Sequence, residues 1–344
     1  MVDSRKFAPD SPAFASLTAA LAQSLASLPA REPVAVALSG GADSSALALI
    51  AAHLCKTHSR PVYLFHIHHG LYDQADDWQQ RVETFSKLID VPLVVKRVQV
   101  HTDSGKGIEA AARLARYQAF VEMASECGVK TLLLAHHRQD QAETVLFRLL
   151  RGAGVQGLTA MRDRTEREGL VYLRPWLDID RDDLLALVAD FSLHTGWLPV
   201  ADPSNTDPQF ARGALRKDIL PAIQAHWPAW KQTLVRHARQ ASEAVQIMDE
   251  VAASDLAQLD LDSQDHSFSL QLWRLLSEPR QSLVLRFWLQ QHGVAMPGDR
   301  KLADLIRQLR QLHQLGTDRD LLWHHDPYVV RCHKGRVRLE SSSR

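Results

Sequence analysis

The stretch VAVALSGGADSSALALI (Val34–Ile50) starts as a short apolar run, passes through two adjacent glycines and continues as a helix-like apolar run. This order predicts a buried β-strand, a glycine turn and a helix. Glycines let successive backbone N–H groups converge on an anion, and a helix N-terminus adds partial positive charge. The stretch lacks the lysine of the Walker pattern GxxxxGK[ST]. It therefore predicts a phosphate loop of another kind, with a plain serine-capped turn as the alternative.

Further apolar runs indicate the surrounding sheet. They are VYLFHIH (62–68), PLVVKRVQV (92–100) and TLLLAHH (131–137), and helical stretches alternate with them. A leading amphipathic helix is expected over SPAFASLTAALAQSLASL (11–28). Near-continuous apolar strands that alternate with helices are typical of a parallel sheet covered on both faces. We predict an α/β, doubly wound parallel sheet in an N-terminal domain of residues 1–222.

Beyond Pro221 the sequence changes to helical patterns, which include LWRLLSEPRQSLVLRFWLQQHG (272–293) and KLADLIRQLRQLHQLG (301–316). The segment DPYVVRCHKGRVRLE (326–340) alternates like a small hairpin. Between Arg239 and Arg274 there are seven acids and no Lys or Arg, so this segment is expected to repel nucleic acid. We predict a second, mostly helical domain over residues 223–344.

Composition limits the class of protein. The chain has 344 residues, 45% of them hydrophobic, and 40 basic against 40 acidic residues, so overall charge predicts no nucleic-acid partner and excludes none. The three cysteines, Cys55, Cys127 and Cys332, form no CxxC pair and favour a reducing compartment. No signal peptide and no apolar run of membrane-spanning length is present. A cytoplasmic location is therefore expected.

The loop SGGADSS resembles the signature SGGxDS of the PP-loop ATP pyrophosphatases. The resemblance implies cleavage of ATP between its α and β phosphates, adenylation of a substrate oxygen and release of pyrophosphate. The predicted ATP-binding residues are Ser39, Gly40, Gly41, Ala42, Asp43, Ser44 and Ser45. A hydroxyl of Ser44 or Ser45 can donate to phosphate, and Asp43 can hold Mg²⁺ or orient the loop.

Other motifs resemble one branch of this superfamily, the tRNA(Ile)-lysidine synthetases. AHHRQDQAETVLFRLLRGAGVQGLTAM (135–161) is similar to the family pattern AHHxxDQxET, which is followed by an arginine-glycine stretch and GLxxM. Four shorter motifs agree in the same order: HIHHGL (66–71), AARLARY (111–117), RPWL (174–177) and DPSNTDPQFARGALRKDILP (202–221). Longer family members carry a further C-terminal domain, so the chain is expected to be a short form or a truncated one.

Asp140 and Glu143 lie three residues apart just after the apolar run 131–137, so on a helix both carboxylates share a face near its first turn. They can bind Mg²⁺ at the ATP phosphates, or receive the ammonium of a lysine substrate. A helix start that favours acids is the alternative. Asp43 and Asp140 are the candidate Mg²⁺ ligands.

Histidines cluster at two strand ends: His66, His68, His69, His136 and His137. Without nearby cysteines or an HExxH helix, they favour a nucleotide crevice over zinc. The resemblance implies that the crevice is bordered by His66, His69, His137, Arg174, Arg212 and Arg216.

The remaining predicted catalytic residues are arginines. Arg113 and Arg116 fall in AARLARY, and the resemblance implies that one of them acts near ATP and substrate; Arg116 is preferred because it is a turn nearer the following apolar run. A tract with Arg148, Arg151, Arg162, Arg164, Arg167 and Arg174 suits phosphate contacts or a solvated charged surface. Two positions depart from the family pattern: Gly213 replaces the asparagine of RNxxR, and Gln139 stands where an acid is common.

The resemblance implies ATP, Mg²⁺, free lysine and tRNA(Ile) with a CAU anticodon as reaction components, with Asp43, Arg113, Arg116, Asp140 and Glu143 as catalytic residues. A homodimer is a further expectation. Two alternatives remain. One is a tRNA cytidine thiolase of the same superfamily, against which the absence of a CxxC pair counts. The other is a non-catalytic RNA-binding module on a decayed synthetase scaffold, in which the loop and the acids should have been lost first.

Overall fold

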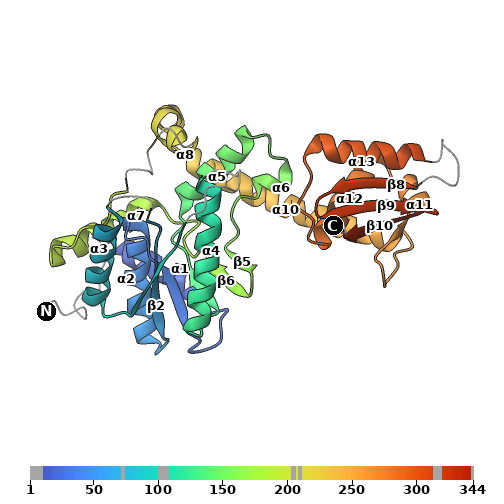
Figure 1. Cartoon of the computed structure of the whole chain (residues 1–344). Coiled ribbons are helices and arrows are strands. Elements are labelled where there is room, and N and C mark those ends of the chain that lie inside the picture. Colours follow the sequence, from blue (N-terminus) through green and yellow to red (C-terminus); the bar gives the residue numbers. More distant parts are fainter. Residues whose placement is uncertain are drawn as a thin grey trace. The chain divides into compact units, whose positions relative to one another are not determined.

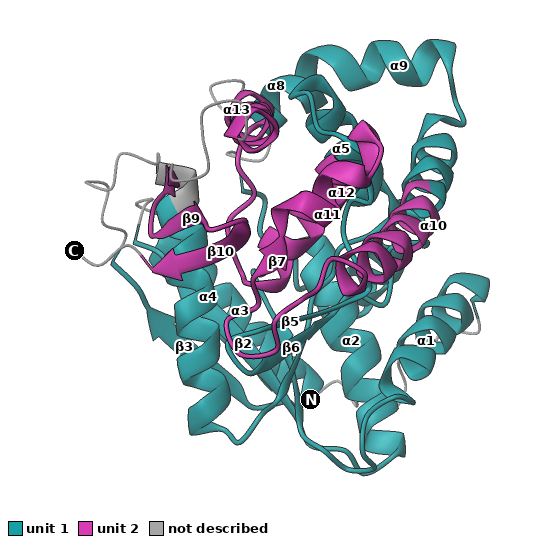
Figure 2. Cartoon of the chain, turned by 90° about the vertical axis from the view of Figure 1, so that its right-hand side faces the viewer, with its two compact units in different colours: residues 1–240 teal, residues 241–344 magenta. Residues whose placement is uncertain are grey.

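The computed structural model describes residues 11–70, 74–99, 108–202, 207, 211–312 and 320–341 (Figure 1). The chain divides into two compact units, residues 1–240 and 241–344 (Figure 2). This division falls inside helix α10 (Trp230–Ala257), 18 residues beyond the boundary that the sequence predicts after residue 222. The predicted boundary between two domains after residue 222 stays a prediction.

The first unit is built on a six-stranded sheet in the order β3-β2-β1-β4-β6-β5. Its strands are β1 (Val34–Ala37), β2 (Val62–His68), β3 (Leu93–Arg97), β4 (Thr131–Leu133), β5 (Arg164–Arg167) and β6 (Leu170–Leu173). All pairs are parallel except β5 with β6. The four predicted apolar runs form β1 to β4, which confirms the parallel α/β sheet.

Both faces of the sheet are buried, as the near-continuous apolar strands predict. Leu64 packs into the cluster formed with α1 (Pro12–Leu25), α2 (Ala42–Thr57), α3 (Ala75–Ile89) and α7 (Arg181–Thr195). The next residue, Phe65, packs on the opposite face against α4 (Ile108–Glu126). Successive side chains of a strand point to opposite faces, so a strand that is apolar at every position must be covered on both sides. This is the doubly wound arrangement.

The antiparallel edge strand β5 was not predicted. Its sequence RTER is mostly exposed and has no apolar alternation, so it reads as part of the charged tract. Charged side chains on an edge strand discourage pairing with another chain. The same tract also contains the short helix α6 (Val155–Leu158).

The second unit combines helices with an antiparallel sheet. Its helices are the later part of α10, α11 (Leu270–Leu275), α12 (Glu278–Gln291) and α13 (Asp299–Gln311). The order of strands in its sheet is β7 (Phe268–Ser269), β10 (Arg336–Ser341), β9 (Tyr328–His333) and β8 (Leu321–His325). The predicted hairpin is β9–β10, and β7 and β8 extend it to four strands. Trp273, Trp288 and Phe268 are fully buried in its core.

The acidic segment that precedes this core is not uniformly negative. Asp255 is buried and pairs with Arg280, and Asp260 pairs with Arg336 at 2.7 Å. The expectation that the segment repels nucleic acid stays a prediction, and the composition on which it rests takes no account of the arginines contributed by later elements.

Candidate active site

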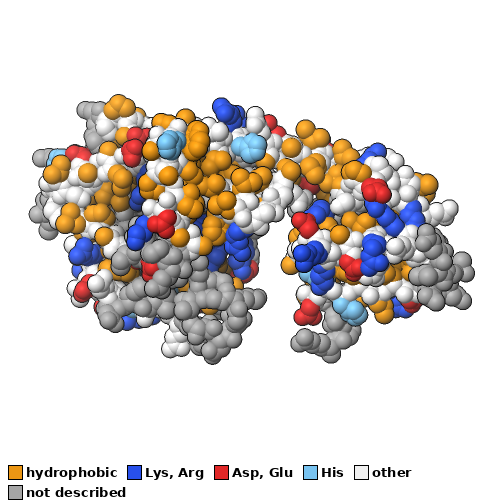
Figure 3. Space-filling model, turned by 90° about the horizontal axis from the view of Figure 1, so that it is seen from above, with side chains coloured by type: hydrophobic (Ala, Val, Ile, Leu, Met, Phe, Trp, Pro, Cys, Tyr) orange, Lys and Arg blue, Asp and Glu red, His pale blue; other side chains and the backbone are white. Residues whose placement is uncertain are grey.

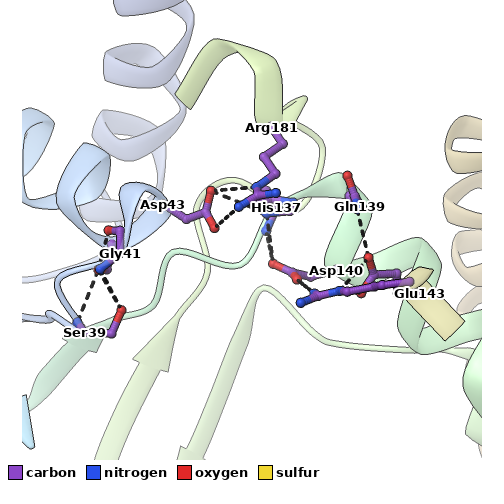
Figure 4. Close-up of polar contacts among 10 residues, drawn as sticks. Ser39, Gly41, Asp43, His137, Gln139, Asp140, Glu143 and Arg181 are labelled. Atoms are coloured by element: carbon purple, nitrogen blue, oxygen red, sulfur yellow. Dashed lines mark hydrogen bonds and ion pairs between the residues drawn. The ribbon is translucent and has the colours of Figure 1, made fainter. Parts of the chain in front are cut away.

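Three helix N-termini meet at the carboxyl edge of the first unit's sheet. β1 leads into α2, β4 leads into α5 (Arg138–Leu150), and the segment after β6 leads into α7. Asp43 of α2 lies within contact distance of both His137, at the start of α5, and Arg181 of α7 (Figure 4). Helix N-termini carry partial positive charge and unpaired N–H groups. The edge is therefore suited to an anion.

The glycine loop is held in a conformation that requires Gly40. Its φ is +88°, and a Cβ there would lie 2.9 Å from side-chain carbons of both Val82 and Val200. The carbonyl oxygen of Gly40 accepts a hydrogen bond from the backbone N–H of Val200 at 2.9 Å. Any side chain at this position would be strained and would displace the residues behind the loop.

The serines of the loop bind the loop itself. The hydroxyls of Ser44 and Ser45 each donate to the carbonyl oxygen of Gly41 at 3.0 Å, and the backbone N–H of Ser39 donates to Ser44 Oγ at 3.2 Å. Ser45 is fully buried. The donors left for a phosphate are the N–H groups of the first turn of α2, which begins at Ala42. Donation from Ser44 or Ser45 to phosphate stays a prediction.

Asp43 is the central carboxylate of the edge. It accepts from Arg181 Nε at 3.0 Å and from Nη2 at 3.2 Å, and its Oδ1 lies 3.8 Å from His137 Nε2. Burial raises the pKa of Asp43, but hydrogen bonds from His137 and Arg181 outweigh burial and leave the pKa below its usual value. Asp43 is therefore ionised at neutral pH. Arg181 lies outside every motif that the sequence singled out.

Asp140 continues this line of polar groups. Its Oδ2 accepts from the backbone N–H of His137 at 3.2 Å and lies 3.3 Å from His137 Nε2. The imidazole of His137 thus stands between the carboxylates of Asp43 and Asp140 (Figure 4). The structure brings together the three residues that two separate motifs contribute.

Glu143 and Arg216 form the deeper part of the site. Arg216 Nε lies 2.9 Å and Nη2 2.7 Å from Glu143 Oε2, and Nη2 lies 3.3 Å from Asp140 Oδ1. The Glu143 side chain is 3% exposed, whereas that of Asp140 is 22% exposed. The two acids share a side of the helix, as predicted, but only Asp140 keeps surface that a ligand can reach.

Arg216 lies in a π-helical turn, Leu215–Ile219, between α8 (Ala211–Ala214) and α9 (Leu220–His226). Such turns are rare and occur often at functional sites. No sequence pattern predicts this turn here. Arg212 lies one turn earlier and reaches Thr144 Oγ1 at 3.4 Å.

The histidines occupy different depths. His66 is buried behind the loop, with Nδ1 2.8 Å from the carbonyl oxygen of Leu38, and burial lowers its pKa. Burial, then the charge of Arg116, lowers the pKa of His69 to about 4. Burial likewise lowers the pKa of His136 to about 4.

Three of the histidines have a ring nitrogen without a hydrogen-bond partner. The buried Nδ1 atoms of His69, His136 and His137 have no partner in the described part of the chain. His66 is accounted for by packing, while the other three retain hydrogen-bonding capacity for a ligand.

The two arginines of α4 differ in their surroundings. Arg113 donates to Tyr117 Oη at 3.1 Å and lies over the ring of Tyr117. Arg116 makes no hydrogen bond or ion pair with the described residues, and its charge acts on His69 at the end of β2. These surroundings support the preference for Arg116, whose catalytic role stays a prediction.

The arginine tract is divided between structural and exposed positions. Arg174 is buried and donates to the carbonyl oxygen of Arg162 and to Thr165 Oγ1, both at 3.0 Å, so it joins β5 to β6. Arg148 donates to the carbonyl oxygens of Gly157 and Ala160. Burial and then the charges of Arg212 and Arg113 lower the pKa of Arg148.

The other members of the tract lie on the surface. Arg151 lies over the ring of Phe147 and Arg167 over that of Tyr117, while Arg164 is exposed on β5. On the face seen in Figure 3, Lys and Arg side chains are mixed with hydrophobic and acidic ones. No uniformly basic face is visible there.

The two departures from the family pattern have local explanations. A Cβ at Gly213 would clash with the carbonyl oxygen of Asp207. Glycine therefore admits the backbone of Asp207 at this position. Gln139 donates to Glu143 Oε1 at 2.9 Å, which an ionised acid in its place could not do.

Replacing Gly213 with Ala is expected to lower the free energy of unfolding by about 1–3 kcal/mol, because the segment at Asp207 must move. The ion pairs of Arg216 should weaken with it, since Arg216 is held one turn further on. Urea denaturation followed by circular dichroism measures the first effect. Gly298→Ala is the control, because a Cβ there meets no atom within 4 Å; since Gly298 is the N-cap of α13, this change is expected to cost at most about 1 kcal/mol. Equal stability of the two variants would contradict the close approach at Asp207.

No group of three or more His, Cys, Asp or Glu side chains in the described ranges is arranged to hold a metal ion by itself. All three cysteines are free thiols, two of them buried. Within the described residues, no helix is long and apolar enough to cross a bilayer.

A glycine loop without the Walker lysine, at the carboxyl edge of a mainly parallel sheet, defines a PP-loop nucleotide-binding protein. Sequence comparison agrees, because residues 15–223 match the family described as PP-loop domain. Residues 268–338 match the TilS substrate binding domain. The first match lies within the first compact unit and the second match within the second unit.

Full-length relatives make the assignment narrower. A tRNA(Ile)-lysidine synthase from Bordetella parapertussis is 51% identical over 312 residues, which cover 91% of this chain and 90% of that protein. Another from Burkholderia mallei is 37% identical over 330 residues, covering 94% of this chain and 64% of that protein. The chain belongs to the tRNA(Ile)-lysidine synthase family, a family of ATP-dependent ligases.

Among solved structures, the U34-tRNA thiolase NcsA from Methanococcus maripaludis is similar, with a TM-score of 0.54. The match covers 67% of this chain and 80% of that chain at 17% identity. A likeness at this identity shows the shared fold alone.

Proposed function

We propose that this chain ligates free lysine to C2 of the wobble cytidine of tRNA(Ile) with a CAU anticodon, giving lysidine, AMP and pyrophosphate. Family membership supports the reaction. The main structural support for it is the row of contacts from Asp43 through His137 to Asp140. The PP-loop lies at one end of this row and the Glu143–Arg216 ion pair at the other. One edge of the sheet thus offers a place for phosphates and a place for an ammonium group.

In the first step, the C2 carbonyl oxygen of the cytidine attacks the α-phosphate of ATP and pyrophosphate leaves. The N–H groups at the start of α2 would receive the anionic leaving group. Arg116 would stabilise charge on the phosphates. This role is supported by the observation that Arg116 forms no hydrogen bond or ion pair with the described residues. The base must be unstacked to reach the edge, as in recognition of single-stranded RNA.

In the second step, the ε-nitrogen of lysine attacks C2, and AMP leaves with the oxygen. Only the neutral amine is a nucleophile, whereas lysine in water has a pKa of about 10.4. A carboxylate must therefore bind the ammonium and help to remove its proton. We assign this role to Asp140, which is 22% exposed, and assign to Glu143, which is 3% exposed, the task of holding Arg216.

Mg²⁺ fits the donor set of the site. Mg²⁺ commonly takes one or two carboxylates together with substrate phosphates and waters, and needs no cage made only of protein ligands. Asp43 would be the principal ligand, with Asp140 as the second candidate, because both carboxylates flank His137. The ion would neutralise charge on the phosphates.

The alternatives are less well supported. A cytidine thiolase in its usual form uses a cysteine cluster, and Cys55, Cys127 and Cys332 are all single free thiols. A decayed scaffold is difficult to reconcile with a glycine kept at position 40, where a side chain would be strained, and with an intact set of ion pairs at Asp43, Asp140 and Glu143. A homodimer remains a proposal drawn from the family resemblance, and a cytoplasmic location remains one drawn from the composition of the sequence. Light scattering and cell fractionation would test them.

The decisive assay mixes the protein with ATP, radiolabelled lysine and tRNA(Ile) carrying CAU. Label is expected in the tRNA, with one pyrophosphate and one AMP formed for each lysine, and lysidine is expected on nucleoside mass analysis. A tRNA(Ile) with another anticodon serves as control. ATP consumption without label in the tRNA, or sulfur in place of lysine when a sulfur donor is supplied, would refute the proposal.

A further inference from the structure

Arg181 lies at the proposed ATP site, and none of the sequence motifs explains why a cation is placed there. It is the first residue of α7, and its guanidinium makes a two-pronged contact with the Asp43 carboxylate, at 3.0 and 3.2 Å (Figure 4). Paired N–H donors on a carboxylate fix orientation as well as distance. The PP-loop acid is thus held by a residue 138 positions later in the chain.

Helix stability does not explain this arginine. The first turn of a helix favours acids and disfavours cations. α7 otherwise obeys that rule, with Asp180 as its N-cap and Asp182 and Asp183 in its first turn. Arg181 is the exception in a run of acids. Its position is therefore explained by the contact with Asp43 and not by the helix that carries it.

The start of α7 is firmly anchored. The backbone N–H of Arg138 donates to the carbonyl oxygen of Ile179 at 3.0 Å, and the Arg138 side chain pairs with Asp180. His137 also forms a β-bridge with Trp176. Arg181 thus projects from an element that is tied to the start of α5. A cation on so fixed a base can set the position of Asp43.

The contact remains open to a ligand. The side chain of Arg181 is 40% exposed and that of Asp43 is 30% exposed. An isolated ion pair of this kind contributes little to stability. The pair should matter more for the binding of an anion than for stability, because Asp43 lies in the first turn of α2, where phosphate is expected to bind. A bare carboxylate at that place would repel each phosphate.

We propose that Arg181 is a positioning residue of the ATP site, which fixes the Asp43 carboxylate and cancels its charge so that the triphosphate can enter. The inference rests on the proposed ATP-dependent function. Arg181 acts through Asp43, so its removal should matter only while Asp43 carries a charge. Mg²⁺ supplied with ATP should replace part of its effect, since the ion also neutralises that carboxylate.

A double-mutant cycle tests this mechanism. The affinity for ATP is measured by equilibrium dialysis for the wild type, Arg181→Gln, Asp43→Asn and the double variant, in EDTA and with Mg²⁺. In EDTA, Arg181→Gln should weaken ATP binding about tenfold in the wild-type background and less than about twofold beside Asp43→Asn. With Mg²⁺ the first loss should shrink to about threefold. Arg181→Lys, which keeps the charge and loses the fork, should fall between.

Other outcomes would overturn the proposal. An equal loss beside Asp43→Asn would mean that Arg181 contacts the nucleotide directly. Unchanged ATP affinity in Arg181→Gln would remove the role altogether. Arg286→Gln is the control, because it breaks an arginine–aspartate pair in the second unit. Thermal unfolding of each variant detects loss of fold. Failure of the wild type to bind ATP would instead refute the proposed function itself.

Discussion

Replacing Asp140 with Asn is expected to slow lysine transfer about 100-fold at low lysine concentration, mainly by raising KM for lysine. Asp140 is the acid that a ligand can reach, and its charge is needed to bind an ammonium and to receive its proton. The release of pyrophosphate that depends on tRNA but not on lysine should change less than about threefold. Single-turnover assays with labelled ATP and labelled lysine separate the two steps.

Two further variants define the role of Asp140. Glu143→Gln should impair both steps together, because the weakened hold on Arg216 disturbs the whole deeper part of the site. Asp182→Asn, a similar change at an exposed acid of α7, should leave both steps intact. Parallel loss of pyrophosphate release in Asp140→Asn would instead assign this carboxylate to ATP or Mg²⁺.

The sequence predicts the parts of this fold that are encoded locally. The strands β1 to β4 are apolar runs with turns between them, and burial on both faces of the sheet follows from that composition. The loop at Gly40 and Gly41 and the helix start at Asp140 also carry local signals, namely adjacent glycines after a strand and acids in a first turn. The close grouping of Asp43, His137 and Asp140 follows once parallel strands share a carboxyl edge.

What the sequence did not predict depends on distant partners. Arg181 stands among acids that mark an ordinary helix start, and its partner Asp43 belongs to another element. Asp140 and Glu143 both pair with Arg216, which comes from a π-helical turn, and their different burial is likewise set by tertiary packing. β5 has no apolar alternation, because it is a charged edge strand. Each of these features becomes visible only when tertiary contacts are known.

The same distinction explains the glycine at position 213. The sequence identifies Gly213 only as a departure from the pattern RNxxR. In the structure it makes room for the backbone of Asp207. A local pattern therefore identified the right position and gave no physical reason for it.

Replacing Asp43 with Asn is expected to reduce pyrophosphate release about 1,000-fold, the largest effect of the changes considered. The carboxylate is ionised, and the substitution keeps its shape while removing its charge. Asp43 is the proposed Mg²⁺ ligand at the loop, so the variant should lose stabilisation of charge on the phosphates. Arg181 would also lose the charged partner that it positions.

The loss should be in chemistry more than in folding. An acid in the first turn of a helix contributes only about 0.3–1 kcal/mol to stability through the helix dipole, so the thermal midpoint should fall by a few degrees at most. Asp77→Asn is the matched control, because Asp77 is an exposed acid in the first turn of α3. Quenched-flow measurement of pyrophosphate with saturating tRNA and ATP gives the rate. A rate within tenfold of the wild type would show that Asp43 only shapes the loop, and the ion would then have to be held by Asp140 and the phosphates alone.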